Sequence, residues 1–134
     1  MSADPFLDTN ILIYAFANGD PRASKALSFM VTGGTVSVQV LNEFVNVSRK
    51  RLARTWSEIE RELAAIRTLL GPPLPLRAED QEEAVRIAKR YNFGIYDSMM
   101  VASAIGAGCT ILYTEDLHHG QKIGALTVRN PFKV

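Results

Sequence analysis

The sequence predicts an α/β fold, a three-layer α/β/α sandwich built on a central parallel sheet. Short apolar runs typical of buried strands alternate with longer amphipathic segments typical of helices. The connections between them are short and rich in Gly and Pro, as turns are. Strands that alternate with helices in this way favour a parallel sheet covered by helices on both faces.

Composition indicates one domain spanning residues 1–134. Hydrophobic residues make up 47% of the 134 residues and charged residues 22%, an ordinary globular balance. We find no repeat, linker or shift in composition that would mark a second domain. The formal net charge is +1, so any basic surface for nucleic acid must be local.

The first third of the chain is expected to contain two strands. Residues 5–7 form a short one that stops at Asp8, and residues 35–38 form a buried one. Between them, residues 11–16 are apolar and fit either a strand or a helix that Asn10 would cap.

Helices are marked by their start and stop signals. Asp20-Pro21 starts a helix that runs toward Met30 and ends at Gly33-Gly34. A second helix is predicted over residues 39–50.

In the middle of the chain, a capping box at residues 55–58 opens an amphipathic helix through Leu69. Gly71-Pro72-Pro73 ends it. Residues 74–76 fit only an edge strand, because Pro75 has no N–H to donate.

The last third is expected to hold two helices and two strands. The first helix spans residues 79–90 and is followed by a turn at 92–94. The second spans residues 97–107 and is closed by Gly108. The two strands are residues 109–113 and 125–128.

Two acids follow predicted strands. Asp8 comes directly after the first strand, and Asp116 comes two polar residues after the strand at residues 109–113. Sites in parallel sheets lie at the carboxyl ends of strands, so both acids would face one crevice if their strands are neighbours.

Asp97 lies in a helix that is apolar nearly all round. Val101 and Ala104 lie within about 40° of it, and the opposite side, with Met99 and Ala102, is apolar too. A carboxylate in such surroundings costs several kcal/mol unless a partner compensates it.

Glu43 lies at the margin of a buried stripe, roughly 40° from Val47, and can reach toward the end of the sheet. No conspicuous Lys or Arg lies near any of the four acids in sequence. Clustered carboxylates without a cation repel one another, and Mg²⁺ or Mn²⁺ would relieve this. Taken singly, Asp8 and Asp97 also fit helix caps, and Asp116 fits a turn.

Four segments carry a resemblance to a known family. Leu7-Asp8-Thr9-Asn10-Ile11 is similar to the opening motif of PIN domains, and the other three are Ser37 to Phe44, Tyr96 to Ala102, and Leu112 to Asp116. Their order along the chain is also that of the family, and the closest match is to VapC-type toxins of type II toxin–antitoxin systems, which have the same length.

The resemblance implies a magnesium-dependent endoribonuclease that a cognate antitoxin inhibits and that forms homodimers. By position, Asp8, Glu43, Asp97 and Asp116 become the catalytic acids. Asp8, Asp97 and Asp116 become the metal ligands, and Thr114, with Asn10 and Ser37, becomes a polar support. Many relatives place a further acid where this chain has Leu117, His118 and His119, so one firmly held ion is expected rather than two.

The densest basic patch comprises Arg49, Lys50, Arg51 and Arg54. It is a candidate for RNA phosphates, and a solvated helix end explains it equally well. Trp56 could stack on bases, but we expect it to be used in packing, and we expect His118-His119 to lie in a surface turn or to contact RNA.

Other classes fit less well. A haloacid-dehalogenase-like phosphatase needs an acid where Asn10 stands, and a receiver domain needs paired acids near the first strand. A PIN-like module that binds RNA or a protein without cleavage remains open. A single cysteine, Cys109, and the lack of a signal peptide or long apolar stretch indicate a cytoplasmic protein with no membrane span.

Overall fold

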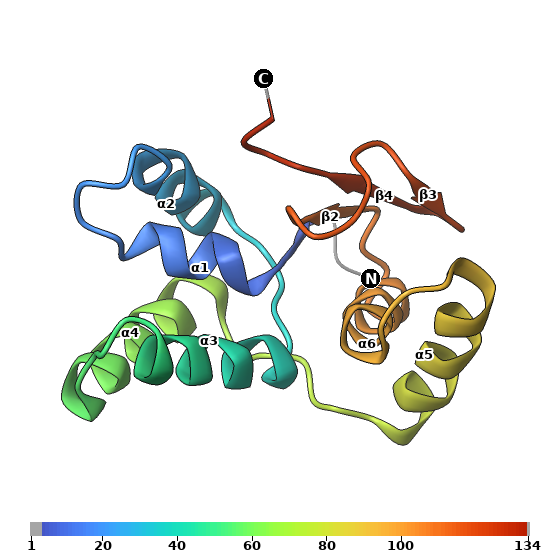
Figure 1. Ribbon diagram of the computed structural model, residues 1–134, viewed down its shortest axis with the longest axis horizontal. Helices are drawn as coiled ribbons and strands as arrows, with labels where there is room; N and C mark the ends of the chain where they lie inside the picture. Colours follow the sequence, from blue (N-terminus) through green and yellow to red (C-terminus); the bar gives the residue numbers. More distant parts are fainter. Residues whose placement is uncertain (1–3, 134) are drawn as a thin grey trace.

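The computed structural model describes residues 4–133, with six helices and four strands among them (Figure 1). In chain order these elements are β1 (Phe6–Leu7), α1 (Thr9–Ala15), α2 (Ala23–Thr32), α3 (Val38–Lys50), α4 (Trp56–Leu70), α5 (Ala78–Tyr91), α6 (Ile95–Gly106), β2 (Ile111–Tyr113), β3 (Lys122–Ile123) and β4 (Leu126–Arg129). Within this part of the chain, none of the helices has the length and apolar character that crossing a membrane requires.

The sheet has the strand order β1-β2-β4-β3. β1 and β2 are parallel with Phe6 opposite Leu112, and β2 and β4 are parallel with Leu112 opposite Val128. β3 was not predicted and is antiparallel to β4, so the sheet is mixed at this edge. In the turn between β3 and β4, Gly124 has a φ of +60°, a backbone conformation that a two-residue hairpin turn requires.

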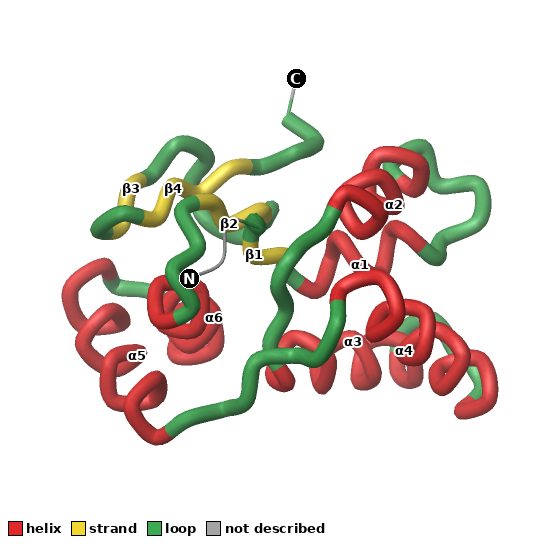
Figure 2. Tube along the Cα trace, turned by 180° about the vertical axis from the view of Figure 1, so that it is seen from behind, coloured by secondary structure: helices red, strands yellow, loops and turns green. Residues whose placement is uncertain are grey.

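The helices form two groups with β1 and β2 between them, which confirms the predicted α/β/α arrangement. Helices α1 to α4 lie on one side, and α5 packs against α6 on the other (Figures 1 and 2). Phe6, Leu7 and Leu112 are fully buried where the groups meet the sheet. The end of β1 therefore lies between helices from both groups.

Two predicted strands are replaced by single bridges. Thr35 forms an isolated bridge with Phe6, and Ser37 forms one with Leu74. Ser37 is already the N-cap of α3, because its hydroxyl accepts the N–H of Val40. The chain turns into a helix before either strand can lengthen.

Helix starts follow the predicted signals with shifts of one or two residues. The capping box of Thr55 and Glu58 is present as predicted. Residues 11–16 belong largely to a helix, and its N-cap is Asp8 rather than Asn10. α2 begins at Ala23, later than Pro21, because Asp20 accepts the N–H of Arg22 within a turn.

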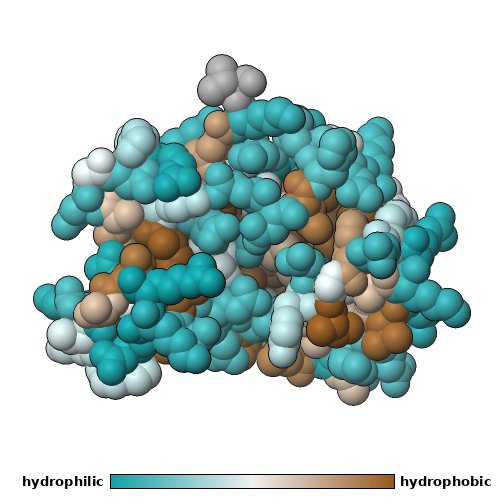
Figure 3. Space-filling model, in the orientation of Figure 1, coloured by the Kyte–Doolittle hydropathy of each residue, from teal (hydrophilic) through white to brown (hydrophobic). Residues whose placement is uncertain are grey.

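One face of the molecule shows apolar surface between α2 and α3, where α1 is exposed (Figure 3). A hollow of about 560 Å³ lies in this region, and the residues along it include Ile13, Tyr14, Ala17 and Leu52.

Candidate metal centre

Asp8 is the most enclosed of the four acids. It directly follows β1, is only 4% exposed, and caps α1, where its Oδ1 accepts the Thr9 N–H at 2.6 Å. Its Oδ2 accepts the hydroxyl of Thr114 at 2.6 Å. Burial, with a smaller contribution from the charge of Asp116, raises the pKa of Asp8 to about 7, although the hydrogen bonds from Thr114 and Thr9 oppose this rise.

Thr114 joins two of the acids. Its side chain is fully buried, and its hydroxyl, which donates to Asp8, accepts the backbone N–H of Asp116 at 3.0 Å. β1 and β2 are adjacent parallel strands, so Asp8 and the residues after Tyr113 leave the sheet at the same end. The sheet thus places Asp8, Thr114 and Asp116 together.

Thr9 connects Asp8 with Glu43. Its backbone N–H donates to Asp8, and its hydroxyl lies 3.3 Å from Glu43 Oε2 and 3.3 Å from the carbonyl of Val40. Burial raises the pKa of Glu43, the Thr9 hydroxyl lowers it, and the charges of Asp97 and Asp116 raise it. α3 therefore presents Glu43 to the other acids.

Asp97 lies in the first turn of α6 and is half-buried. Burial raises its pKa, and the charge of Asp116 adds to the rise. The position of Asp97 on an apolar helix predicted that it would have the least access to water of the four acids. In the structure, Asp8 is much more buried than Asp97. The difference arises because Asp97 stands at the exposed start of its helix, beside Tyr96, which is 72% exposed.

The four acids repel one another without a compensating cation. Asp116 raises the pKa values of the other three, and no Lys or Arg among residues 4–133 forms an ion pair with any of them. Within the same residues, no three His, Cys, Asp or Glu side chains already form a metal-ligand cluster. Mg²⁺ suits such a site, since it keeps several waters and binds through one or two carboxylates.

The predicted supports differ in their surroundings. Thr114 contacts Asp8 directly. Ser37 is buried at the start of α3, and its hydroxyl caps that helix. Asn10 is half-buried in the first turn of α1, with no side-chain hydrogen bond to residues 4–133.

The residues of the predicted basic patch have different surroundings. Arg54 pairs with Glu62 at 2.9 Å and donates to the carbonyl of Phe16. Arg49 lies over the ring of Trp56, at 4.6 Å from its centroid. Lys50 and Arg51 are exposed at the end of α3.

Both histidines are exposed after β2, and His119 Nδ1 accepts the backbone N–H of Asn130 at 2.9 Å. That contact holds the loop to the segment after β4. It matches the surface turn expected from the sequence.

Sequence reasoning missed a network beside the acids. The Tyr14 hydroxyl donates to Glu115, and Arg22 lies over the Tyr14 ring at 3.6 Å. Arg22 also pairs with Asp20 at 2.9 Å and lies 4.0 Å from Glu115. Burial and the bond to Glu115 raise the pKa of Tyr14 to about 12. Only the adjacency of Glu115 to Asp116 hinted at this network in the sequence.

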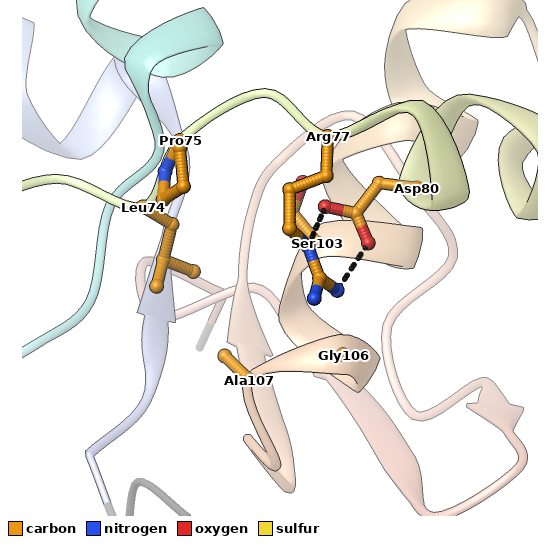
Figure 4. Close-up of a pocket in the computed structure, with 7 residues that line it drawn as sticks. All are labelled: Leu74, Pro75, Arg77, Asp80, Ser103, Gly106 and Ala107. Atoms are coloured by element: carbon orange, nitrogen blue, oxygen red, sulfur yellow. Dashed lines mark hydrogen bonds and ion pairs between the residues drawn. The ribbon is translucent and has the colours of Figure 1, made fainter.

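A separate hollow of about 240 Å³ lies between the chain at Leu74 and the end of α6 (Figure 4). Arg77 and Asp80, three residues apart at the start of α5, form two hydrogen bonds on one side of it, at 3.1 and 2.9 Å. The hollow contains none of the four acids, so it is distinct from the site above.

These features define an α/β protein with an acidic site at the carboxyl end of a parallel sheet. The sequence profile of the PIN domain matches residues 6–122. The chain therefore belongs to the PIN domain family. No curated protein gives a significant match.

Three solved structures share the fold. A toxin–antitoxin complex from Klebsiella pneumoniae has a TM-score of 0.75 at 21% identity, covering 98% of this chain and 100% of that one. Mycobacterium tuberculosis VapC20, described as a sarcin–ricin loop cleaving toxin, has a TM-score of 0.67 at 22% identity, covering 84% and 90%. VapBC2 from Rickettsia felis, bound to a promoter DNA fragment, has a TM-score of 0.64 at 18% identity, covering 92% and 96%.

Proposed function

We propose that this protein is a magnesium-dependent endoribonuclease that hydrolyses RNA phosphodiester bonds and acts as the toxin of a toxin–antitoxin pair. The observation that carries the proposal is the set of four acids that repel one another, none of which forms an ion pair with a Lys or Arg of residues 4–133. Such a set is costly in a folded protein unless it binds a cation.

Membership of the PIN domain family supports nuclease chemistry. The described activity of VapC20 supports RNA as the substrate class. The toxin–antitoxin complex from Klebsiella pneumoniae supports an antitoxin as partner. We expect a homodimer in the cytoplasm, with residues 1–134 as one nuclease domain.

Asp8, Asp97 and Asp116 are the residues that would hold the ion, in part through water. When bound, Mg²⁺ or Mn²⁺ supplies Lewis-acid stabilisation of a phosphate oxygen and lowers the pKa of bound water. Oxygen-only donors without thiolates or imidazoles fit a hard cation of this kind.

The chain's own residues prepare this site. Thr114 and the Thr9 N–H both donate to Asp8, which favours its ionised form over the neutral form that burial favours. Glu43, held by Thr9, is placed to orient a water or accept its proton. Attack by water would leave 5′-phosphate and 3′-hydroxyl ends.

The test is incubation of a broad RNA panel with the wild-type protein in Mg²⁺ and in EDTA. Asp8→Asn is compared with Glu82→Gln, which also removes one negative charge, but from the exposed face of α5. We expect cleavage in Mg²⁺ by wild type and Glu82→Gln, and at least a hundredfold loss in Asp8→Asn and in EDTA.

Full activity in a folded Asp8→Asn protein would contradict the site assignment. Binding of RNA with no metal-dependent cleavage across the panel would favour the alternative, a PIN-like module that binds RNA or a partner without cleaving.

A further inference from the structure

We infer that the hollow between α3 and the start of α4 binds an unstacked base of single-stranded RNA, with Trp56 as the stacking surface. The hollow measures about 400 Å³ and is lined by Asn42, Val45, Asn46, Arg49, Lys50 and Trp56. This inference rests on the proposed function, because RNA is the substrate class that function implies.

Trp56 has the exposure of a binding residue rather than a core residue. It is 55% exposed as the first residue of α4, so the packing role expected from the sequence is largely unrealised. Arg49 lies over its ring, and one guanidinium N–H donates to the Arg54 carbonyl at 2.9 Å. The guanidinium covers part of the ring while more than half of the residue stays exposed, and aromatic rings of this kind stack on bases without regard to sequence.

The other lining groups match the edges and charge of a nucleotide. Asn42 and Asn46 are exposed, and neither amide has a hydrogen-bond partner among residues 4–133. Amides of this type bind the edges of unpaired bases. Arg49 and Lys50 are basic and no acid lines the hollow, so its charge is complementary to RNA phosphate.

A single-stranded RNA fits these groups better than a protein partner does. Much of the exposed lining is apolar surface that a base can cover, and its polar groups are two cations and two amides, which pair with the phosphates and base edges of RNA. The mixture of one aromatic ring, two amides and two cations is typical of single-strand recognition.

The hollow also lies close to the acids along α3. Asn46 lies three residues after Glu43, and Arg49 lies six residues after it. These spacings correspond to a rise of about 5–9 Å along the axis of α3. A strand whose phosphate reaches the acids can therefore place a neighbouring base against Trp56.

Trp56 is the only tryptophan of the chain, so its fluorescence reports on this hollow alone. The experiment titrates the non-cleaving Asp8→Asn protein in EDTA with a short single-stranded oligoribonucleotide of mixed sequence. A matched oligomer with an abasic sugar–phosphate backbone is the second titrant. We expect saturable quenching by the first and little by the second.

Variants give the second readout, which is affinity for the oligoribonucleotide measured with a labelled RNA. Trp56→Ala should weaken binding about tenfold or more, and Trp56→Phe should stay within about threefold because it keeps a ring. Lys50→Ala should weaken binding a few-fold, whereas Lys89→Ala, which removes the same charge from exposed α5, should not. Thermal unfolding checks that each variant is folded.

Several outcomes would overturn the inference. They are unchanged fluorescence at saturating RNA, unchanged affinity in folded Trp56→Ala, equal quenching by the abasic backbone, and a fluorescence change that depends on protein concentration without RNA. The last would show that a second copy of the chain covers the hollow. RNA cleavage by wild type without quenching of Trp56 fluorescence would contradict this inference alone. Quenching without RNA cleavage would contradict the nuclease proposal alone.

Discussion

At the scale of single residues, Asp8 is deeply buried and forms no ion pair with a Lys or Arg of residues 4–133. Its pKa rises from 3.8 to about 7, so between these values the folded protein holds a proton that the unfolded chain has lost. Folding stability therefore falls as the pH rises from about 4 through 7, and the cost is fully present above pH 7. The metal-free protein should therefore be less stable at neutral pH than at acidic pH.

We predict that in EDTA the melting temperature of the wild-type protein falls between pH 5 and pH 8. Asp8→Asn removes the buried charge and should flatten this fall, gaining up to about 4 kcal/mol over wild type at pH 8, since each pKa unit between 3.8 and about 7 corresponds to ~1.4 kcal/mol. Glu82→Gln should keep the wild-type slope. An equal slope in wild type and Asp8→Asn, measured by calorimetry, would rule out this origin.

Thr114 offers a second test at this scale, because it donates to Asp8. Thr114→Val removes the hydroxyl with little change of shape, so the pKa of Asp8 should rise. We expect activity at neutral pH to fall about 10–100-fold and the acid limb of the pH–rate profile to move to higher pH. Thr114→Ser keeps the hydroxyl and should retain the wild-type profile; a shared loss in both would indicate packing instead.

At the scale of elements, the N-cap of α3 supports the helix that carries Glu43. Ser37→Ala removes the hydroxyl that accepts the Val40 N–H, and should cost about 1 kcal/mol in the free energy of unfolding. Thr55→Ala is the matched control, since it removes the cap of α4, which carries none of the four acids. We expect similar losses of stability and little loss of cleavage rate in both; a rate loss confined to Ser37→Ala would give its hydroxyl a role at the site.

The loop after β2 is tied to α1 through Tyr14 and Glu115. Tyr14→Phe keeps the ring under Arg22 but loses the hydroxyl. Because Asp116 follows Glu115, we expect weaker Mg²⁺ binding. The Mg²⁺ concentration for half-maximal cleavage should rise a few-fold, and the free energy of unfolding should stay nearly unchanged. Tyr91→Phe, on α5, is the control, and no difference between the two would show that the tie does not position Asp116.

Much of this could be predicted from local sequence. The capping box of α4 and the apolar run of β2 each specify an element by themselves, and the sequence also marked the four acids. The bridges at Thr35 and Leu74 and the antiparallel β3 depend on contacts between distant segments. Thr9 was missed for the same reason: its hydroxyl meets Glu43 only after α1 packs on α3.

At the scale of the whole molecule, the proposed metal site would link ion binding to folding. The acids come from both helix groups and from both parallel strand ends, so an ion shared among them ties these parts together. A ligand that binds only the folded state stabilises it, by about 2.7 kcal/mol at a hundred times its dissociation constant.

We therefore expect Mg²⁺ to raise the melting temperature of the wild-type protein at pH 8, in a concentration-dependent way. Asp8→Asn should lose most of this increase, and Glu82→Gln should keep it. NaCl at equal ionic strength separates specific binding from screening by salt. The same increase with every variant would place the ion elsewhere.

The backbone at Gly34 has a consequence for how the chain tolerates change. A Cβ at this position would lie 2.6 Å from Cδ1 of Leu7, which is fully buried in β1 directly before Asp8. In a saturation mutagenesis screen for toxicity, substitutions of Gly34 should thus be depleted of active clones almost as strongly as those of Asp8. Depletion at Gly34 would then reflect its role in holding the backbone of β1 that positions Asp8, and not a contact between Gly34 and the substrate.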